Sequence, residues 1–223
     1  MWHLPTAVDA LRFTTEDGVT LVGELRAAEG DRRGGAVLAH PHPRHGGSKD
    51  HPLLWAIRNE LAGKRGVSVL SFNFRGVMGS EGTFGGGEGE VLDLGAALGE
   101  LERRSEPPTL VVGWSFGARV ALARAVSDPR VGALALLGLS LSEPRFRLPD
   151  LPNRSQIRGL DLPVLLLSGE ADQFSPAPEL RMLGRRLPRG EVVVVENAGH
   201  FFDRREREIA EIVGSFAERA LSR

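Results

Sequence analysis

The sequence Gly113-Trp114-Ser115-Phe116-Gly117 joins an apolar run at 110–112 to a helix-compatible run at 118–126. This pattern predicts a strand, a tight turn and a helix, with Ser115 in the turn. Such a turn strains the backbone of the serine, and a Cβ at either flanking glycine would collide with the neighbouring strand or helix. We therefore expect the Ser115 hydroxyl to be exposed at the carboxyl end of a strand.

Short apolar runs alternate with helical patterns along the rest of the chain. Runs at 11–14 and 19–25 flank the turn signal Glu16-Asp17-Gly18 and predict an N-terminal hairpin at the edge of a sheet. Continuous Val/Leu runs, typical of strands covered on both faces, lie at 36–39, 67–72, 110–112, 131–137, 164–167 and 192–195. Helical patterns lie at 52–62, 89–102, 116–126, 178–187 and 204–221. The alternation predicts a doubly wound α/β fold with a parallel sheet, and the segment 141–159 is too short for a large lid.

Length and composition limit what kind of protein this is. The 223 residues are 41% hydrophobic and no linker-like stretch divides them, so we expect a single domain over residues 1–223. The net charge of −1, with acidic and basic residues interspersed, argues against nucleic acid or a membrane surface as partner. The lack of cysteine excludes disulfides, thiolate metal sites and a cysteine nucleophile. No signal peptide or membrane span is recognisable, which predicts a cytoplasmic protein.

Three residues that follow predicted strands form a chemically meaningful set. In an open α/β sheet, ligands bind beyond the carboxyl ends of the strands. Ser115, Asp172 and His200 each follow a strand, in the chain order Ser, Asp, His. A serine hydroxyl is a poor nucleophile at neutral pH, so an imidazole must take its proton and a carboxylate must orient that imidazole. Glu170, two residues before Asp172, is the competing acid.

The oxyanion formed by attack of a serine needs N–H donors that are already in place. One comes from the residue after the nucleophile, Phe116, and the second from the turn after an earlier strand. In that turn Pro41 and Pro43 have no N–H, so the His42 backbone N–H is the best candidate, with Arg44 behind it. Four aromatic side chains are candidates for the wall of an apolar acyl pocket: Trp114, Phe84, Phe174 and Phe201.

Several segments together resemble the α/β-hydrolase superfamily, in particular its small, lid-poor bacterial serine hydrolases, which are dienelactone-hydrolase-like or carboxylesterase-like. The resemblance rests on residues 38–43, 72–76, 79–82, 113–117, 169–172 and 199–202. It implies an eight-stranded, mostly parallel sheet with helices on both faces and no large lid. It also implies a triad of Ser115, Asp172 and His200, with Phe116 and His42 as oxyanion donors. The sequence differs from this family pattern at Met78-Gly79, where the resemblance implies a Gly-x-Gly-like turn after Arg75-Gly76.

His40, His42 and His45 form a second candidate site of a different kind, because their spacing is similar to that of the metal-binding histidines of metallo-hydrolases. A binuclear site needs an acidic ligand within the cluster and further ligands downstream. Arg44 occupies the middle of the cluster instead, and beyond residue 51 the only histidine is His200. We therefore expect no metal and no other cofactor.

The sequence thus predicts a serine hydrolase that cleaves carboxylic esters of small or medium acyl substrates through a Ser-His-Asp triad and an acyl-enzyme intermediate. A thioesterase, a small-substrate serine peptidase or an acyltransferase would use the same triad, so they remain alternatives. A non-catalytic α/β-hydrolase scaffold and a metal-dependent hydrolase using His40, His42 and His45 are less favoured. The expected partner is a small ester-like molecule, and the edge hairpin and the last helix are candidate surfaces for a homodimer.

Overall fold

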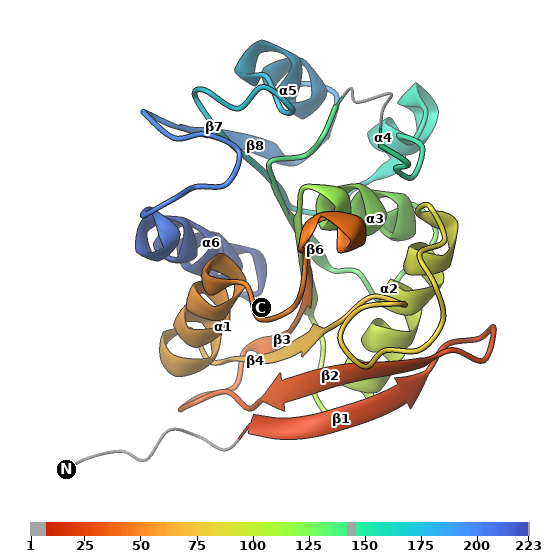
Figure 1. Ribbon diagram of the computed structural model, residues 1–223. Helices are drawn as coiled ribbons and strands as arrows, with labels where there is room; N and C mark the ends of the chain where they lie inside the picture. The colour runs from red at the N-terminus through yellow and green to blue at the C-terminus, as the bar shows by residue number, and fades with distance from the viewer. Residues whose placement is uncertain (1–7, 142–145, 223) are drawn as a thin grey trace.

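The computed structural model describes residues 8–141 and 146–222. Its strands are β1 (Val8–Thr14), β2 (Thr20–Arg26), β3 (Gly34–Ala39), β4 (Val67–Phe72), β5 (Thr109–Trp114), β6 (Ala133–Leu137), β7 (Val164–Gly169) and β8 (Gly190–Val195). They form one sheet in the order β1-β2-β4-β3-β5-β6-β7-β8 (Figure 1). β2 is antiparallel to β1 and β4, and the other pairs are parallel. This confirms the expected eight-stranded, mostly parallel sheet, while the single-domain organisation of residues 1–223 stays a prediction.

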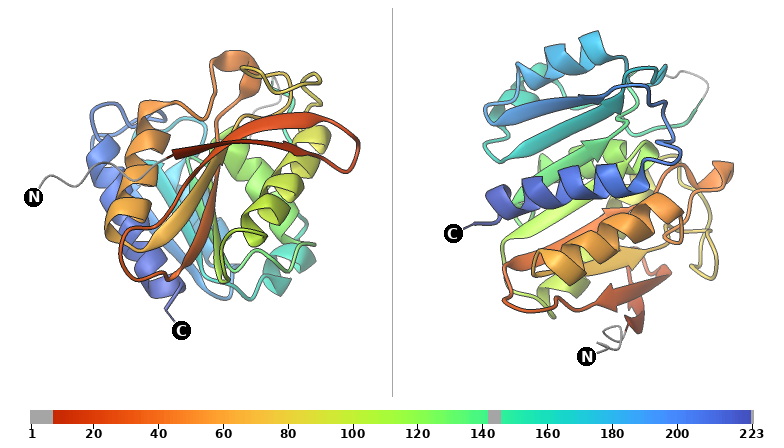
Figure 2. Two further views of the ribbon diagram at one scale, coloured as in Figure 1. Left: turned by 90° about the horizontal axis from the view of Figure 1, so that it is seen from below. Right: turned by 90° about the vertical axis from the view of Figure 1, so that its left-hand side faces the viewer.

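Helices cover both faces of this sheet, as expected. They are α1 (Pro52–Lys64), α2 (Glu88–Glu102), α3 (Phe116–Ala125), α4 (Arg154–Gly159), α5 (Ala177–Gly184) and α6 (Glu206–Ala220). α1 and α6 lie side by side over one face (Figure 2), and α2 and α3 share a second core on the other face with α4 and α5. None of the described helices is long and apolar enough to cross a membrane.

The strands are continuously apolar because both of their faces are buried. In β5, Leu110 and Val112 belong to the core under α1 and α6, whereas Val111 belongs to the core under α2 and α3. Side chains of a strand alternate between the two faces of the sheet. Each position in such a strand therefore meets a helix layer, and a polar residue would be buried on either side.

Two short helical segments lie where the sequence predicted none. α4 begins with a capping box, in which Asn153 Oδ1 accepts from the Gln156 N–H and the Gln156 side chain accepts from the Asn153 N–H. A 3-10 turn, η1 (Pro43–His45), follows β3. α4 buries one side chain, Ile157, which is too little to produce a recognisable period. The described part of the β6–β7 connection holds no larger element, in agreement with the expected absence of a large lid.

The direction in which successive strands are added to the sheet reverses at β3. The chain passes from β3 to β4 on one side, and β5 then pairs with the other side of β3. In open α/β sheets, such a reversal opens a crevice at the carboxyl ends of the two strands. The turns that follow β3 and β5 carry His42 and Ser115, so the fold brings these two predicted site residues to the same crevice.

Candidate active site

The turn between β5 and α3 holds Ser115 in a strained conformation. Its φ and ψ are 55° and −110°, and its N–H donates to Leu137 O at 2.8 Å. A Cβ at Gly113 would lie 2.4 Å from Gly117 O, and a Cβ at Gly117 would lie 2.2 Å from Ala39 O. Both glycines are therefore required by close backbone approach, as the sequence pattern predicts.

The structure brings Ser115, His200 and Asp172 together. The Ser115 Oγ lies 2.9 Å from His200 Nε2, and His200 Nδ1 lies 2.9 and 3.0 Å from the two carboxylate oxygens of Asp172. Asp172 Oδ1 also accepts from the N–H groups of Phe174 and Ser175, at 2.9 and 3.0 Å. Asp172 and His200 are 3% and 8% exposed, so the carboxylate and imidazole are shielded from water while they contact each other.

Glu170, the competing acid, points elsewhere. Its carboxylate accepts from the Asn197 N–H at 3.1 Å and the residue is exposed. Nearby, a Cβ at Gly169 would lie 2.2 Å from Ala198 O, so the end of β7 packs directly against the loop that carries His200. The acid that contacts the imidazole is therefore Asp172 and not Glu170.

Gly138 is a site residue that the sequence analysis did not single out. It follows β6 with a φ of 51°, and its N–H donates to Leu167 O at 2.7 Å. A Cβ there would lie 3.0 Å from His200 Cε1 and 3.2 Å from Asp172 Oδ2. The glycine thus lets the β6 turn pass beside the His–Asp pair. The sequence feature that could have indicated this role is a glycine directly after a buried strand, at the carboxyl edge of the sheet.

The two predicted oxyanion donors lie in the wall of one cavity beside Ser115. Phe116 is the first residue of α3, where backbone N–H groups have no intrahelical acceptor. Within the described residues, neither the Phe116 N–H nor the His42 N–H donates to another backbone group. Both groups are therefore available to an oxygen atom of a ligand.

This cavity, which we call the catalytic pocket, has a volume of about 300 Å3 and mostly apolar walls. Three of the four predicted wall residues line it: Trp114, Phe174 and Phe201. Trp114 has a second role, because it is fully buried and its Nε1–H donates to His200 O at 3.3 Å. It therefore packs the turn into the core and supports the histidine loop. Phe201 is 57% exposed, at the mouth of the pocket.

Phe84, the fourth predicted wall residue, does not line the catalytic pocket itself. Phe84 lines a neighbouring cavity, with its ring centroid 4.9 Å from that of His42. The loop before α2 is held by Glu90, whose carboxylate accepts from the Gly85 and Gly87 N–H groups at 2.8 and 2.7 Å. Phe84 also contacts Phe116, with ring centroids 5.7 Å apart, and no local sequence pattern indicates this position.

The histidine cluster after β3 does not form a common set of ligands. His40 is fully buried, donates from Nδ1 to Pro41 O at 2.6 Å, and accepts from the Phe74 N–H at Nε2 at 3.0 Å. Burial lowers the pKa of His40 to about 4, so its ring stays neutral with both nitrogen atoms occupied. Among residues 8–141 and 146–222, no group of three or more His, Cys, Asp or Glu side chains is arranged to hold a metal ion.

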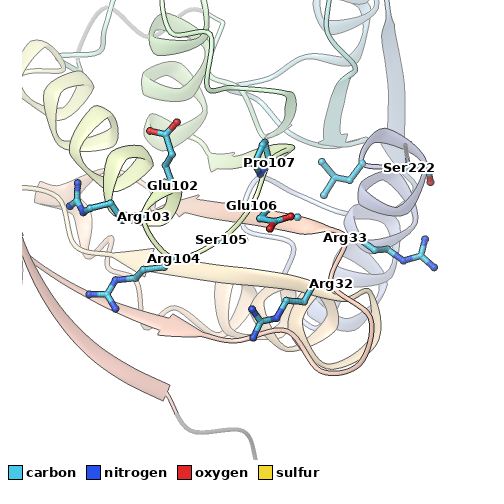
Figure 3. Close-up of a pocket in the computed structure, with 11 residues that line it drawn as sticks. Arg32, Arg33, Glu102, Arg103, Arg104, Ser105, Glu106, Pro107 and Ser222 are labelled. Atoms are coloured by element: carbon cyan, nitrogen blue, oxygen red, sulfur yellow. The ribbon is translucent and has the colours of Figure 1, made fainter.

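A larger cavity, of about 830 Å3, lies at the opposite ends of the strands (Figure 3). It is lined by the segments before β3 and after α2 and by the end of α6. Figure 3 shows the guanidinium groups of Arg33 and Arg104 pointing away from each other. Arg33 lies 3.8 Å from Glu218, and Arg104 donates to Glu100 at 2.6 Å. The lining contains no histidine, and its charged groups do not converge on a common volume.

Comparison with known proteins agrees with this geometry. The family model for the alpha/beta hydrolase domain matches residues 34–220. The chain belongs to this alpha/beta hydrolase family. An uncharacterised protein of Rickettsia prowazekii is 29% identical to this alpha/beta hydrolase over 189 residues, which are 81% of this chain and 77% of that protein. An uncharacterised protein of Mycobacterium tuberculosis is 29% identical over 215 residues, covering 88% of this chain and 73% of that protein.

Solved structures of other alpha/beta hydrolases share the fold. A serine hydrolase without a lid from Xanthomonas campestris has a TM-score of 0.79 at 23% identity, with 97% of this chain and 96% of that chain covered. An esterase from Pyrococcus furiosus has a TM-score of 0.80 at 22% identity, with 97% and 94% covered. These likenesses confirm the fold class, and the family match over residues 34–220 confirms the predicted resemblance to the α/β-hydrolase superfamily.

Proposed function

We propose that this alpha/beta hydrolase is a serine hydrolase that cleaves carboxylic esters of small or medium acyl substrates. The observation that carries the proposal is the continuous hydrogen-bonded series from Ser115 Oγ through the His200 ring to the Asp172 carboxylate. A hydroxyl on a strained turn, an imidazole nitrogen 2.9 Å from it and a buried carboxylate behind that imidazole are the three parts that acyl transfer requires.

In the proposed mechanism, Ser115 Oγ attacks the ester carbonyl carbon while His200 Nε2 takes the hydroxyl proton. The N–H groups of Phe116 and His42 bind the oxyanion that forms. His200 then gives its proton to the departing alcohol oxygen, which leaves the acyl group on Ser115. A water molecule, deprotonated by His200, attacks this acyl-enzyme and releases the acid. Asp172 accepts from His200 Nδ1 throughout and stabilises the imidazolium.

The catalytic pocket supports small or medium substrates with an apolar part. Its volume of about 300 Å3 is at the small end of ligand sites, and Phe146, Leu148 and Phe174 form part of its wall. A thioesterase, a small-substrate peptidase or an acyltransferase would use the same triad. A matched panel of ester, thioester and amide with one acyl group separates them, and we expect the highest kcat/KM for the ester.

The first experiment is labelling of the purified protein with a fluorophosphonate probe, followed by location of the modified peptide by mass spectrometry. We expect covalent modification at Ser115 and none in the Ser115→Ala variant, because the probe reacts with an activated serine hydroxyl. The same variant should lose esterase activity.

The proposal is contradicted if the folded protein is not labelled and cleaves no ester, which would favour a non-catalytic scaffold. It is also contradicted if esterase activity survives in Ser115→Ala but is lost with a chelator, which would favour the metal-dependent alternative. A cytoplasmic location and self-association through β1 or α6 stay predictions from the sequence.

A further inference from the structure

A second cavity adjoins the catalytic pocket. Its volume is about 190 Å3. It shares three lining residues with the catalytic pocket: His42, His45 and Phe146. Its other lining residues are Arg44, Phe84 and Arg147. We call it the side cavity. The two cavities therefore adjoin each other at the three shared residues.

Charge distinguishes the two cavities. Among the described residues, the lining of the catalytic pocket contains no Asp, Glu, Lys or Arg. The lining of the side cavity, within the same described residues, contains two arginines and no carboxylate. Within the described residues, neither the Arg44 nor the Arg147 side chain takes part in a hydrogen bond or an ion pair. Two guanidinium groups for which the described residues supply no counter-ion favour an anionic ligand group.

Arg147 lies against the glycine loop before α2. Gly86 has a φ of 77°, and a Cβ there would lie 2.7 Å from Arg147 Nε and 2.8 Å from its Cζ. Glu90 holds this loop through the N–H groups of Gly85 and Gly87. Gly86 therefore leaves room for the guanidinium beside a loop whose position is fixed, which limits the arrangements open to Arg147.

The His42 ring lies beside the segments that carry both arginines. Its Nδ1 accepts from the Arg44 N–H at 3.2 Å, and the ring lines the side cavity together with Arg147. Burial, followed by the nearby His45, lowers the pKa of His42 to about 4, so the ring is neutral at physiological pH. One neutral imidazole thus lies beside both arginine-bearing segments, in the turn that we propose as part of the oxyanion site.

We propose that the substrate is an ester that also carries a carboxylate, which Arg44 and Arg147 bind in the side cavity while Ser115 attacks the ester carbonyl. This inference rests on the proposed esterase function. Arginine is suited to the task, because its planar guanidinium pairs with a carboxylate through two parallel hydrogen bonds. In the proposed mechanism the acyl carbonyl oxygen lies against the His42 N–H, so we place the carboxylate on the acyl part.

The test compares two esters of similar size, monomethyl adipate and methyl hexanoate, at pH 7.5, where the free carboxyl group of the first is ionised. We expect kcat/KM to be about 10-fold or more higher for monomethyl adipate, since a charge-assisted hydrogen bond contributes on that scale. The preference should shrink as salt is raised from 50 mM to 1 M, because both arginines are exposed.

Variants connect this preference to the two arginines. In Arg44→Gln/Arg147→Gln, the ratio of the two kcat/KM values should fall to near 1, and each single variant should give an intermediate ratio. Arg32→Gln is the matched control, because Arg32 lines the cavity at the opposite ends of the strands. The control should keep the ratio of the unchanged protein.

The possible results separate this inference from the proposed function. Labelling of Ser115 and cleavage of methyl hexanoate, with a ratio near 1 or a ratio that the double variant does not change, overturns the inference and leaves the esterase intact. A preference confined to an alcohol-side pair, 6-acetoxyhexanoate against hexyl acetate, overturns the placement on the acyl part. No labelling and no cleavage of any ester overturns the proposed function and the inference with it.

Discussion

Asp172 contacts His200 through both of its carboxylate oxygens, and this pairing predicts the effect of changing it. In Asp172→Asn the side chain has nearly the same shape, but its amide cannot hold the Nδ1–H tautomer or stabilise the imidazolium. We expect kcat for a simple ester to fall by about 10³-fold or more while the fold is retained. Glu170→Gln is the matched control and should stay within about 2-fold of the unchanged protein. A larger loss in Glu170→Gln would show that the acid is wrongly assigned.

A substitution at Gly138 is expected to lower the rate of catalysis. An alanine there would need a φ of 51° and would press its Cβ against the His200 ring, 3.0 Å from Cε1. We expect Gly138→Ala to lower kcat by about 10-fold or more, because small displacements of a catalytic base are costly. Gly159→Ala is the control, since no atom lies within 4 Å of a Cβ at that position. Equal steady-state rates in the two variants would argue against a positioning role for Gly138.

The residues of the site differ in how far the sequence predicts them. Ser115, Asp172 and His200 are recognisable because each follows an apolar strand and the chemistry demands each residue type. Gly138 and Arg147 are not, because their roles depend on chain segments that meet only in the folded molecule. For the same reason, the sequence does not indicate which of the two adjoining cavities Phe84 lines, since the position of its loop depends on Glu90.

At the scale of elements, α3 fixes the wall of the catalytic pocket through Arg119. The Arg119 guanidinium donates to Ser140 O at 2.9 Å and to Pro149 O at 2.8 and 2.5 Å. Ser140 itself lines the pocket. One buried side chain thus holds Ser140 and Pro149, at two points of the β6–β7 connection, against the helix that follows Ser115.

Arg119→Met should therefore lower the free energy of unfolding by about 1–3 kcal/mol, since it leaves buried carbonyl oxygens without a donor. Chemical denaturation measures this change. Arg158→Met, at an exposed position on α4, serves as control and should change the value by about 0.5 kcal/mol or less. Equal free energies of unfolding for the two variants would mean that the three hydrogen bonds of Arg119 contribute little to stability.

The elements themselves follow from the sequence wherever burial makes the pattern strong. The strands of the parallel part are continuous Val/Leu runs because helices cover both faces, and their centres are predicted correctly while their ends shift by a few residues. α4 was missed because its signal is a capping box in a Pro- and Arg-rich segment with one buried side chain. Short helices of this kind are stabilised by tertiary packing rather than by their own periodicity.

At the scale of the whole molecule, His40 makes stability depend on pH. Its pKa in the folded protein is about 4 because it is buried, whereas an unfolded histidine takes up its proton near pH 6.5. Between these values the unfolded state binds more protons than the folded state, so the contribution is complete above about pH 6.5 and is lost as pH falls towards 4. The loss would reach about 3 kcal/mol for this group.

His40→Gln should flatten this dependence, because the Gln amide supplies one donor and one acceptor but does not titrate. The measurement is the free energy of unfolding at pH 7.5 and pH 4.5 for both proteins. Other histidines, including His42, contribute to both curves alike, so the difference between the curves isolates His40. Parallel curves would mean that His40 does not carry the effect.

The order of the site residues along the chain has a consequence for synthesis of the protein. His42 and Ser115 follow β3 and β5, whereas Asp172 and His200 follow β7 and β8, the last two strands. A nascent chain on the ribosome can therefore pair most of its sheet before His200, the proposed base, has been added. In the proposed mechanism the unfinished protein cannot consume its substrate, and the onset of activity during translation would report the moment at which β8 joins the sheet.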